Sequence, residues 1–152
     1  MKKVFFVIII IAIMFVFFIS CKKANSNAIN NNITADTTEW AINGVTDTAT
    51  GIFQTFNVIS ISDYSGDELN ITFGSLPYGN QTYTVVSSNV TPNATQCNLN
   101  VITGNNNITY YSTGAIGNKV TLTTGNREVF TFSNITVSGD SSNKTVSGTI
   151  LE

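Results

Sequence analysis

The sequence contains no histidine, and charged residues are scarce along its whole length. Of its 152 residues only 11% are charged, with seven Lys and Arg against nine Asp and Glu. The missing imidazole excludes histidine-based acid–base catalysis and histidine-ligated metal sites. The net charge of −2 does not suit a nucleic-acid partner, because binding to phosphates requires clustered Lys and Arg. We therefore expect neither a nucleic-acid partner nor a cofactor.

Cysteine is also scarce, since the chain holds only Cys21 and Cys97. In the stretch QCNLNV, Cys97 alternates with polar residues and shares a face with Leu99 and Val101. Such alternation is typical of a half-buried strand, so the sequence predicts a buried, unreactive thiol at Cys97. Cys21 stands instead at the junction between an apolar run and a polar segment rich in Asn, Ser and Thr, which indicates a different role.

The apolar run of residues 4–19 follows a short basic start with two lysines. As a helix at about 1.5 Å per residue it would extend about 24 Å, short of a hydrocarbon core of about 30 Å. A basic head, an apolar middle and a small residue at the end describe a secretory signal peptide. We interpret residues 1–20 as a signal helix of this kind. The alternative is a single-pass anchor in which Cys21 is incidental.

The end of this signal, FISC at residues 18–21, resembles the lipobox of bacterial lipoproteins. In a lipobox, apolar residues and a small residue precede a cysteine that is diacylated and becomes the new N-terminus; here Phe18 stands where Leu is usual. Two or three acyl chains, at about 0.8 kcal/mol per buried methylene, attach a protein to a membrane without a transmembrane helix. The resemblance implies that Cys21 is the lipidation site and that the membrane is the partner of the mature N-terminus.

The segment after Cys21 has no periodic apolar pattern up to residue 37. We interpret residues 21–37 as the lipidated N-terminus and a flexible tether. Asp36-Thr37 and Asp47-Thr48, each followed by a small or polar residue, resemble the O-glycosylation acceptor of Bacteroidota proteins. Thr37 and Thr48 are therefore candidate modification sites.

Residues 38–152 read as a single β domain. Short runs of β-branched and aromatic residues alternate with turns that contain Gly and Asn. Asn43-Gly44 predicts a tight hairpin, whereas the run 52–61 is too apolar for simple alternation and fits a β-bulge near Asn57 or burial of both faces. About ten short strands predict an all-β fold, either an antiparallel β-sandwich or a partly closed barrel. The inward positions we expect are Leu69, Ile71, Phe73, Tyr83, Val85, Cys97, Leu99, Val101, Val120, Leu122, Phe130, Phe132, Val146 and Ile150.

The lipobox followed by CKK, the polar tether, EWAINGV at the start of the domain and TVSGTILE at its end together resemble small envelope lipoproteins of Bacteroidota. The resemblance implies a lipid-anchored protein of the bacterial cell envelope, held at the outer membrane. It implies a β domain without catalytic residues to carry over. In that group, acidic residues soon after the cysteine accompany export to the cell surface. The segment KKANSN has no acidic residue, so the sequence does not decide between the cell surface and the periplasmic side of the membrane.

An enzyme built on this chain would have to use carboxylates, Ser, Thr or Tyr. Glycoside hydrolysis needs two carboxyl groups about 5–10 Å apart, and nothing in the sequence brings Asp63, Asp67, Glu68 or Glu128 into such a pair. The stretch SDYSGDE at residues 62–68 groups three acids that could bind calcium, but it lacks the spacing of a known calcium loop. We interpret it as an acidic hairpin turn. We therefore do not expect an enzyme, and a hydrolase is the least favoured function.

A non-catalytic role remains, either structural or in binding a partner protein of the envelope. With so few lysines to guard sheet edges, we expect an edge that is paired or covered, and a partner could supply the strand. The alternative is a surface carbohydrate-binding module, because sugars are held by aromatic faces and polar hydrogen bonds. Tyr64 and Tyr78 lie in predicted loops, and Tyr111 is the candidate for the outward residue of the Tyr110-Tyr111 pair. Asp63 and Asn80 would accompany them.

Overall fold

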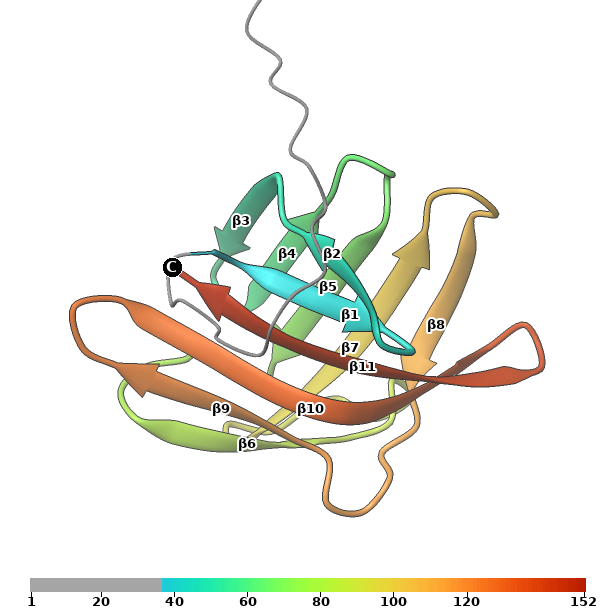
Figure 1. The fold of residues 1–152 in the computed structure, drawn as a ribbon. Coiled ribbons are helices and arrows are strands. Elements are labelled where there is room, and N and C mark those ends of the chain that lie inside the picture. Colours follow the sequence, from blue (N-terminus) through green and yellow to red (C-terminus); the bar gives the residue numbers. More distant parts are fainter. Residues whose placement is uncertain (1–36) are drawn as a thin grey trace, which may run out of the picture. The chain divides into compact units, whose positions relative to one another are not determined.

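The computed structural model describes residues 37–152, and every regular element among them is a β-strand (Figure 1). The predicted all-β class is confirmed, with eleven strands and no helix in this part of the chain. Residues 37–152 accordingly contain no helix of the length and apolarity that a membrane span requires. The predicted signal peptide, Cys21 and the tether up to residue 36 lie outside the described residues. The strands are β1 (Glu39–Ile42), β2 (Val45–Thr48), β3 (Gly51–Thr55), β4 (Val58–Ser62), β5 (Glu68–Phe73), β6 (Gln81–Val85), β7 (Gln96–Thr103), β8 (Ile108–Ser112), β9 (Lys119–Thr124), β10 (Glu128–Gly139) and β11 (Ser142–Leu151).

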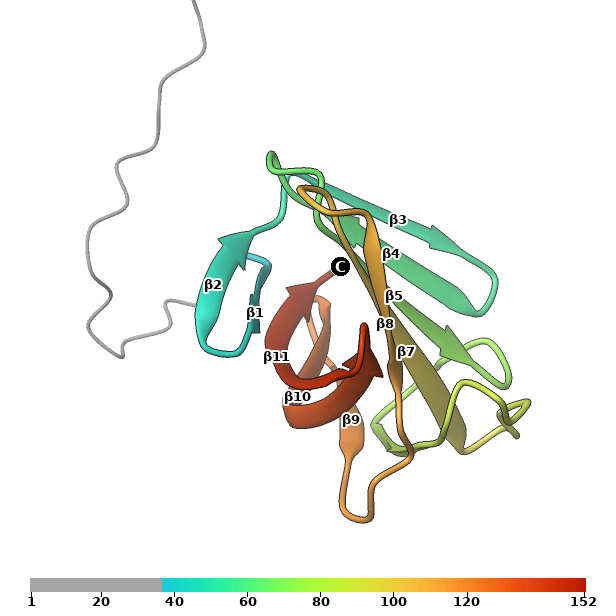
Figure 2. The same ribbon diagram turned by 90° about the vertical axis from the view of Figure 1, so that its right-hand side faces the viewer.

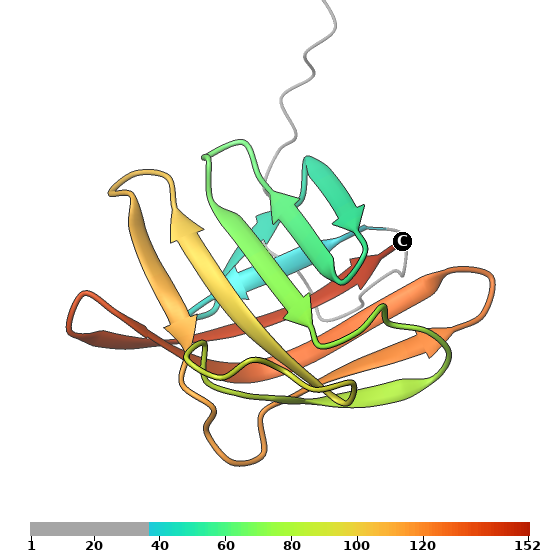
Figure 3. The same ribbon diagram turned by 180° about the vertical axis from the view of Figure 1, so that it is seen from behind.

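The strands form one sheet that closes on itself in its middle. Its order is β2-β1-β11-β10-β9-β6-β7-β5-β4-β3, and β8 pairs with both β7 and β10, so that β10, β9, β6, β7 and β8 form a ring. The prediction of a partly closed barrel therefore holds. Strands β3, β4, β5, β7 and β8 make one layer, named layer A here. Figure 2 shows layer A facing the layer of β1, β2, β9, β10 and β11, and Figure 3 views layer A from its outer side.

One ladder departs from the antiparallel pattern that the sequence predicts. β6 and β7 run parallel, and their register covers only Thr84↔Gln96 and Val85↔Cys97. A parallel pair needs a crossover in place of a hairpin, and residues 86–95 supply it. The ring is closed on its other side by an equally short ladder, in which β8 meets β10 at Val137↔Ser112 and Ser138↔Tyr111.

The first four strands form two hairpins, β1–β2 and β3–β4. Asn43 and Gly44 both have positive φ angles, 50° and 78°, which confirms the tight turn predicted between β1 and β2. The prediction for residues 52–61 was wrong, because this run is a hairpin of two strands, β3 and β4, and not one bulged strand. Phe56 makes the turn with φ of 47°. A bulky residue rarely adopts this conformation, so the sequence carries no turn signal there.

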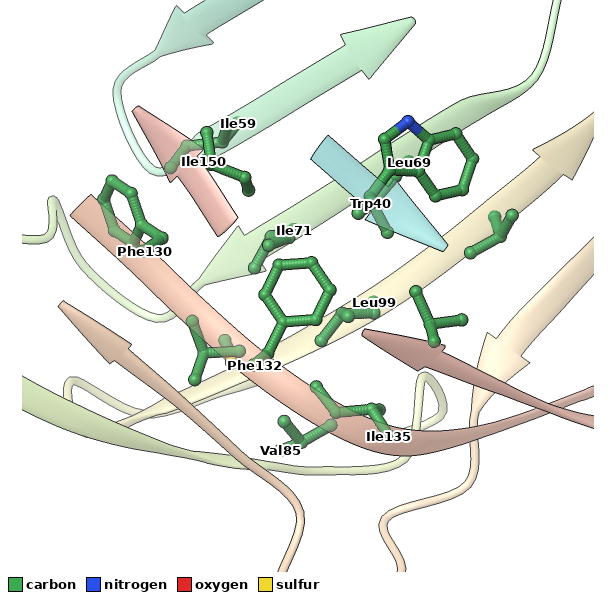
Figure 4. Close-up of a cluster of buried hydrophobic side chains, with 14 of the residues drawn as sticks. Trp40, Ile59, Leu69, Ile71, Val85, Leu99, Phe130, Phe132, Ile135 and Ile150 are labelled. Atoms are coloured by element: carbon green, nitrogen blue, oxygen red, sulfur yellow. The ribbon is translucent and has the colours of Figure 1, made fainter. Parts of the chain in front are cut away.

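The core fills the space between the two layers (Figure 4). All of the predicted inward positions are buried. Phe73 contacts Tyr83 edge to face, with ring centroids 4.7 Å apart, and its ring lies 5.6 Å from that of Phe130. Cys97 is fully buried, and this burial raises the pKa of its thiol to about 12. The thiolate is therefore suppressed at neutral pH, and the prediction of a buried Cys97 is confirmed.

A β-bulge in β10 changes which of its residues face the core. The register with β11 shifts between Phe132 and Ile135, where Asn134 has φ of 52°. Phe132 points inward before the bulge, and Ile135 and Val137 point inward after it. Alternation alone would have placed these two residues outward, and the bulge therefore adds two buried positions that the sequence did not reveal.

Candidate functional site

The two loop tyrosines proposed for sugar binding lie at opposite ends of β5. Tyr64 is in the β4–β5 turn and is 92% exposed, whereas Tyr78 is in the β5–β6 loop and is 74% exposed. β5 extends from residue 68 to residue 73, and at about 3.3 Å per residue its ends are about 17 Å apart. The structure therefore does not bring the two rings into one site.

The polar companions of these tyrosines are engaged in holding turns. Asp63 Oδ1 accepts hydrogen bonds from the backbone N–H groups of Ser65 at 2.9 Å and Asp67 at 2.8 Å, an Asx turn of the kind expected for this residue. Asn80 Oδ1 accepts from the N–H of Thr124 at 2.6 Å and from its hydroxyl at 3.1 Å. This pair fastens the β5–β6 loop to the end of β9.

Tyr110 and Tyr111 point in opposite directions, as a regular strand requires. Tyr110 is 3% exposed, and the Lys144 ammonium lies 4.4 Å from its ring centroid in a cation–π contact. Tyr111 is 47% exposed on the outer side of layer A. Of the three candidate tyrosines, Tyr111 is the one that lies on a regular strand.

Cross-strand register places Tyr111 at the end of a continuous row of outward side chains. Phe53 pairs with Ser60, Ser60 with Asn70, Asn70 with Asn100, and Asn100 with Tyr111. Directly paired residues point to the same face of a sheet. We call these five residues the outer row. They cross layer A from its edge strand β3 to β8, and Figure 3 shows the ribbons of these strands from the outer side.

The outer row is polar in its middle and aromatic at both ends. Ser60 donates to Asn70 Oδ1, and Asn70 Nδ2 donates to Glu68 Oε1 at 2.9 Å. Asn100 Oδ1 finds no hydrogen-bond partner within the described residues. Two further rows of outward residues flank the outer row. One consists of Thr55, Val58, Thr72 and Asn98, and the other consists of Gly51, Ser62, Glu68, Ile102 and Thr109. Glu68 is thus the single charge among these outward positions.

A cleft lies where the turns β1–β2, β4–β5 and β7–β8 meet. Its volume is about 430 Å³, within the range of small-molecule pockets, and Asp47, Asp67, Asn105, Asn106 and Lys144 contribute to its walls. Gly104 allows the turns to approach closely, because a Cβ there would lie 2.5 Å from the carbonyl oxygen of Ser65. The N–H of Gly104 also donates to Asp67 Oδ1 at 2.7 Å.

Asp47 is the residue of this cleft that sequence reasoning missed. Its carboxylate lies with those of Asp63 and Asp67 in a group whose oxygens are within 4.8 Å of one another. Oxygen donors of this kind suit a hard cation such as Ca²⁺, although Asp63 and Asp67 already accept backbone hydrogen bonds. The signal was present in the sequence: a two-residue turn after Ile42 pairs Trp40 with Asp47 and so places a charge on the inward face.

The neighbourhood of Asp47 opposes its ionisation. Partial burial and then the negative charges of Asp63 and Asp67 raise the pKa of Asp47 from 3.8 to about 6. A carboxyl group whose folded-state pKa is raised binds its proton more tightly in the folded chain than in the unfolded chain. The stability that this proton supplies is therefore complete at low pH and declines as the pH rises from about 4 through 6.

Replacing Asp47 by Asn is expected to remove this dependence. At pH 8 the free energy of unfolding of Asp47→Asn should exceed that of the wild type by about 1 kcal/mol, since solvent screens part of the repulsion. Near pH 3.5 the two proteins should unfold together, because Asp47 is then protonated in the folded state. Thermal unfolding followed by circular dichroism at both pH values measures the difference. A constant difference at both would contradict the assignment.

The two candidate glycosylation sites are exposed. Thr37 is exposed, and its hydroxyl donates to Glu39 Oε1 at 3.3 Å. Thr48 is exposed at the end of β2. Both threonines border a hollow of about 390 Å³ that Thr38, Gly51 and Leu151 also line.

The two ends of the sheet are not alike. β2 carries Asp47, whereas no charged residue and no proline occurs from Gly51 to Ser62, the whole of the β3–β4 hairpin. Ile52 and Phe53 on β3 are 38% and 65% exposed, and Phe56 at the hairpin tip is 85% exposed. The β3 edge is therefore free of charged residues of its own within the described part of the chain, and the charges near it come from Glu152 and Arg127.

Comparison with known protein families, with curated proteins and with solved structures finds no match to this chain. The residues themselves are thus the basis for any functional assignment. Among the surfaces of residues 37–152, the β3 edge, the outer row and the cleft at the turns carry the arguments for function.

Proposed function

We propose that this chain is a lipid-anchored protein of a bacterial cell envelope, of the kind found in Bacteroidota, attached to the outer membrane through acylated Cys21. Its β domain binds a partner protein and does not catalyse a reaction. The signal peptide that ends in FISC supports the anchor, and the absence of histidine supports the non-catalytic role. The observation that carries partner binding is the free, uncharged edge of β3.

An edge strand presents a row of N–H and C=O groups that can pair with a further strand. Natural proteins blunt such edges with lysine, proline, a bulge or a covering segment. Within residues 37–152, β3 has no lysine, proline or bulge of its own, although the Glu152 carboxylate lies against Gln54, whereas β2 at the other end of the sheet bears Asp47. The contrast favours β3 as the edge that is used.

The partner that fits this edge is an extended segment of another envelope protein. Main-chain hydrogen bonds would supply affinity, and alternate side chains would supply specificity. Ile52 and Gln54 lie on the inward side of β3, opposite Ile61 and Ile59, and Phe53 lies on the outer side. A segment with uncharged, partly apolar side chains matches these surfaces, because a charge placed beside Phe53 or Ile52 would lose solvation.

The test compares matched lysine substitutions on the two edges. Thr55→Lys adds a charge to β3, and Thr46→Lys adds the same charge to β2; both threonines are exposed. Affinity purification from cross-linked envelopes should recover one partner in equal amount with the wild type and with Thr46→Lys. Recovery with Thr55→Lys should fall about fivefold or more, which corresponds to about 1 kcal/mol. Equal recovery with both variants, or no stoichiometric partner, would reject the β3 assignment.

A further inference from the structure

The outer row combines features that no hairpin turn within residues 37–152 brings together. Two exposed aromatic rings, Phe53 and Tyr111, lie at its ends, and hydroxyl and amide groups lie between them. We infer that the outer side of layer A binds a neutral oligosaccharide along this row. This site uses the outer face of layer A, whereas the partner proposed above would pair with the main-chain groups at the edge of β3, and Phe53 is the residue that both proposals share.

The dimensions of the row suit an extended chain of sugars. From Phe53 to Tyr111 the row crosses four strand-to-strand steps, and at about 4.8 Å each it extends about 19 Å. Its middle is a partly buried strip, since Ser60, Asn70 and Asn100 all have intermediate exposure. A polymer of several sugar units can lie along such a strip, whereas a compact ligand would contact only part of it.

The aromatic and amide groups lie next to one another at the β8 end. Tyr111 is directly opposite Asn100, so their Cβ atoms are about 5 Å apart. A tyrosine presents an apolar ring face with a polar tip, which can cover the C–H face of a sugar while the neighbouring amide meets its hydroxyl groups. This adjacency is fixed by strand pairing and not by a loop.

Asn100 also has hydrogen-bonding capacity that the protein leaves unused. Its side-chain oxygen lacks a partner within residues 37–152, and an unsatisfied amide oxygen that is shielded from water is costly. Asn70, the adjacent member of the row, is by contrast engaged by Ser60 and Glu68. The oxygen is covered in this structure, so the partly exposed Asn100 side chain must rotate before a sugar hydroxyl can donate to it.

The charge on this face selects among polysaccharides. Glu68 is the single charged residue among the outward positions of the three registered rows, and it is negative. Uronic-acid polymers would be repelled, and no cation is present there to pair with sulfate or phosphate groups. A neutral glucan or mannan fits the face better than an anionic polymer.

The test is affinity electrophoresis of the full chain in detergent through gels that contain glucomannan, β-glucan or polygalacturonate. The wild type should be retarded by at least one neutral polymer and not by polygalacturonate. Tyr111→Ala should weaken retardation about tenfold, and Phe53→Ala, at the other end of the row, should also weaken it. Tyr64→Ala is the matched control, since Tyr64 is 92% exposed in a turn outside the row, and it should bind as the wild type does.

Three outcomes would overturn the inference. The wild type passing through every neutral gel without retardation is one. Loss of binding in Tyr64→Ala equal to that in Tyr111→Ala is the second, because it would move the site to the turns. Stronger retardation by polygalacturonate than by the neutral polymers is the third. None of these results bears on partner recovery by Thr55→Lys, so the two proposals fail separately.

Discussion

Trp40→Ala is expected to lower the free energy of unfolding by about 3–5 kcal/mol. Trp40 is 1% exposed and is the largest buried side chain of the described domain. It lies on β1, which pairs with β11 on one side and β2 on the other, and Figure 4 shows its indole within the central cluster. The loss would consume much of the stability of an ordinary domain, which is about 5–15 kcal/mol.

The packing around Trp40 explains why the cavity cannot close. Gly148 lies opposite Trp40 on β11 and opposite Phe132 on β10. A Cβ at Gly148 would lie 2.7 Å from the Phe132 ring and 3.0 Å from the Trp40 Cβ, so the two aromatic residues already fill the space above the glycine. With the indole removed, Gly148 has no side chain that could move into the void.

Urea unfolding of the full chain, followed by far-ultraviolet circular dichroism, measures this loss. Tryptophan fluorescence is unsuitable, because Trp40 is the sole tryptophan. Trp40→Phe should lose less than Trp40→Ala, since it keeps one ring and removes an indole N–H that has no partner among the described residues. Tyr64→Ala should change stability by less than about 0.5 kcal/mol. A Trp40→Ala protein within about 1 kcal/mol of the wild type would contradict the packing described.

Cys21→Ala is expected to abolish the incorporation of labelled palmitate. In the lipidation that we propose, the thioether would form on the sulfur of Cys21, and alanine offers no atom for it. Because the acyl chains would then supply the binding to the membrane, the variant should also be released from washed membranes or keep its signal peptide. Metabolic labelling of cells, followed by gel fluorography and intact-mass measurement, gives both readouts.

Cys97→Ala is the matched control for this experiment, because Cys97 is the other cysteine of the chain. Its thiol is fully buried with a raised pKa, so labelling of Cys97→Ala should equal that of the wild type. Unchanged labelling in Cys21→Ala, or lost labelling in Cys97→Ala, would refute lipidation at Cys21. The proposed envelope location would then lose its main support.

Alternation of polar and apolar residues was sufficient to predict most of the core. Leu69, Ile71 and Phe73 on β5 are buried as their spacing indicates, because a strand in a two-layer fold packs one face on the core and leaves the other toward solvent. The alternation did not predict the places where a turn or a bulge shifts which residues face the core, because nothing in the sequence marks them. Phe56 turns the chain in a conformation that favours glycine, and the bulge at Asn134 reverses the facing of β10.

The candidate sites were predictable only in part, and the reason is strand order. Asp47 could have been placed opposite Trp40 from the Asn43-Gly44 turn alone, since that pairing is local. The outer row could not be predicted, because β5 pairs directly with β7, although β6 lies between them in the sequence. The pairing of Asn70 with Asn100 follows only from this non-sequential strand order, and nothing local in either strand encodes that order.

The place of β1 in the sheet has a consequence for the order in which the chain can mature. Residues 39–42 pair with residues 146–149, which are distant in the sequence. A contact of this span must wait until β11 has been synthesised, and it pays the entropy of closing a long loop. Until then, Trp40 has no β11 to pack on. The described domain can therefore complete its core only after its last strand has left the ribosome, and a chain cut before β11 would leave β1 without this neighbour.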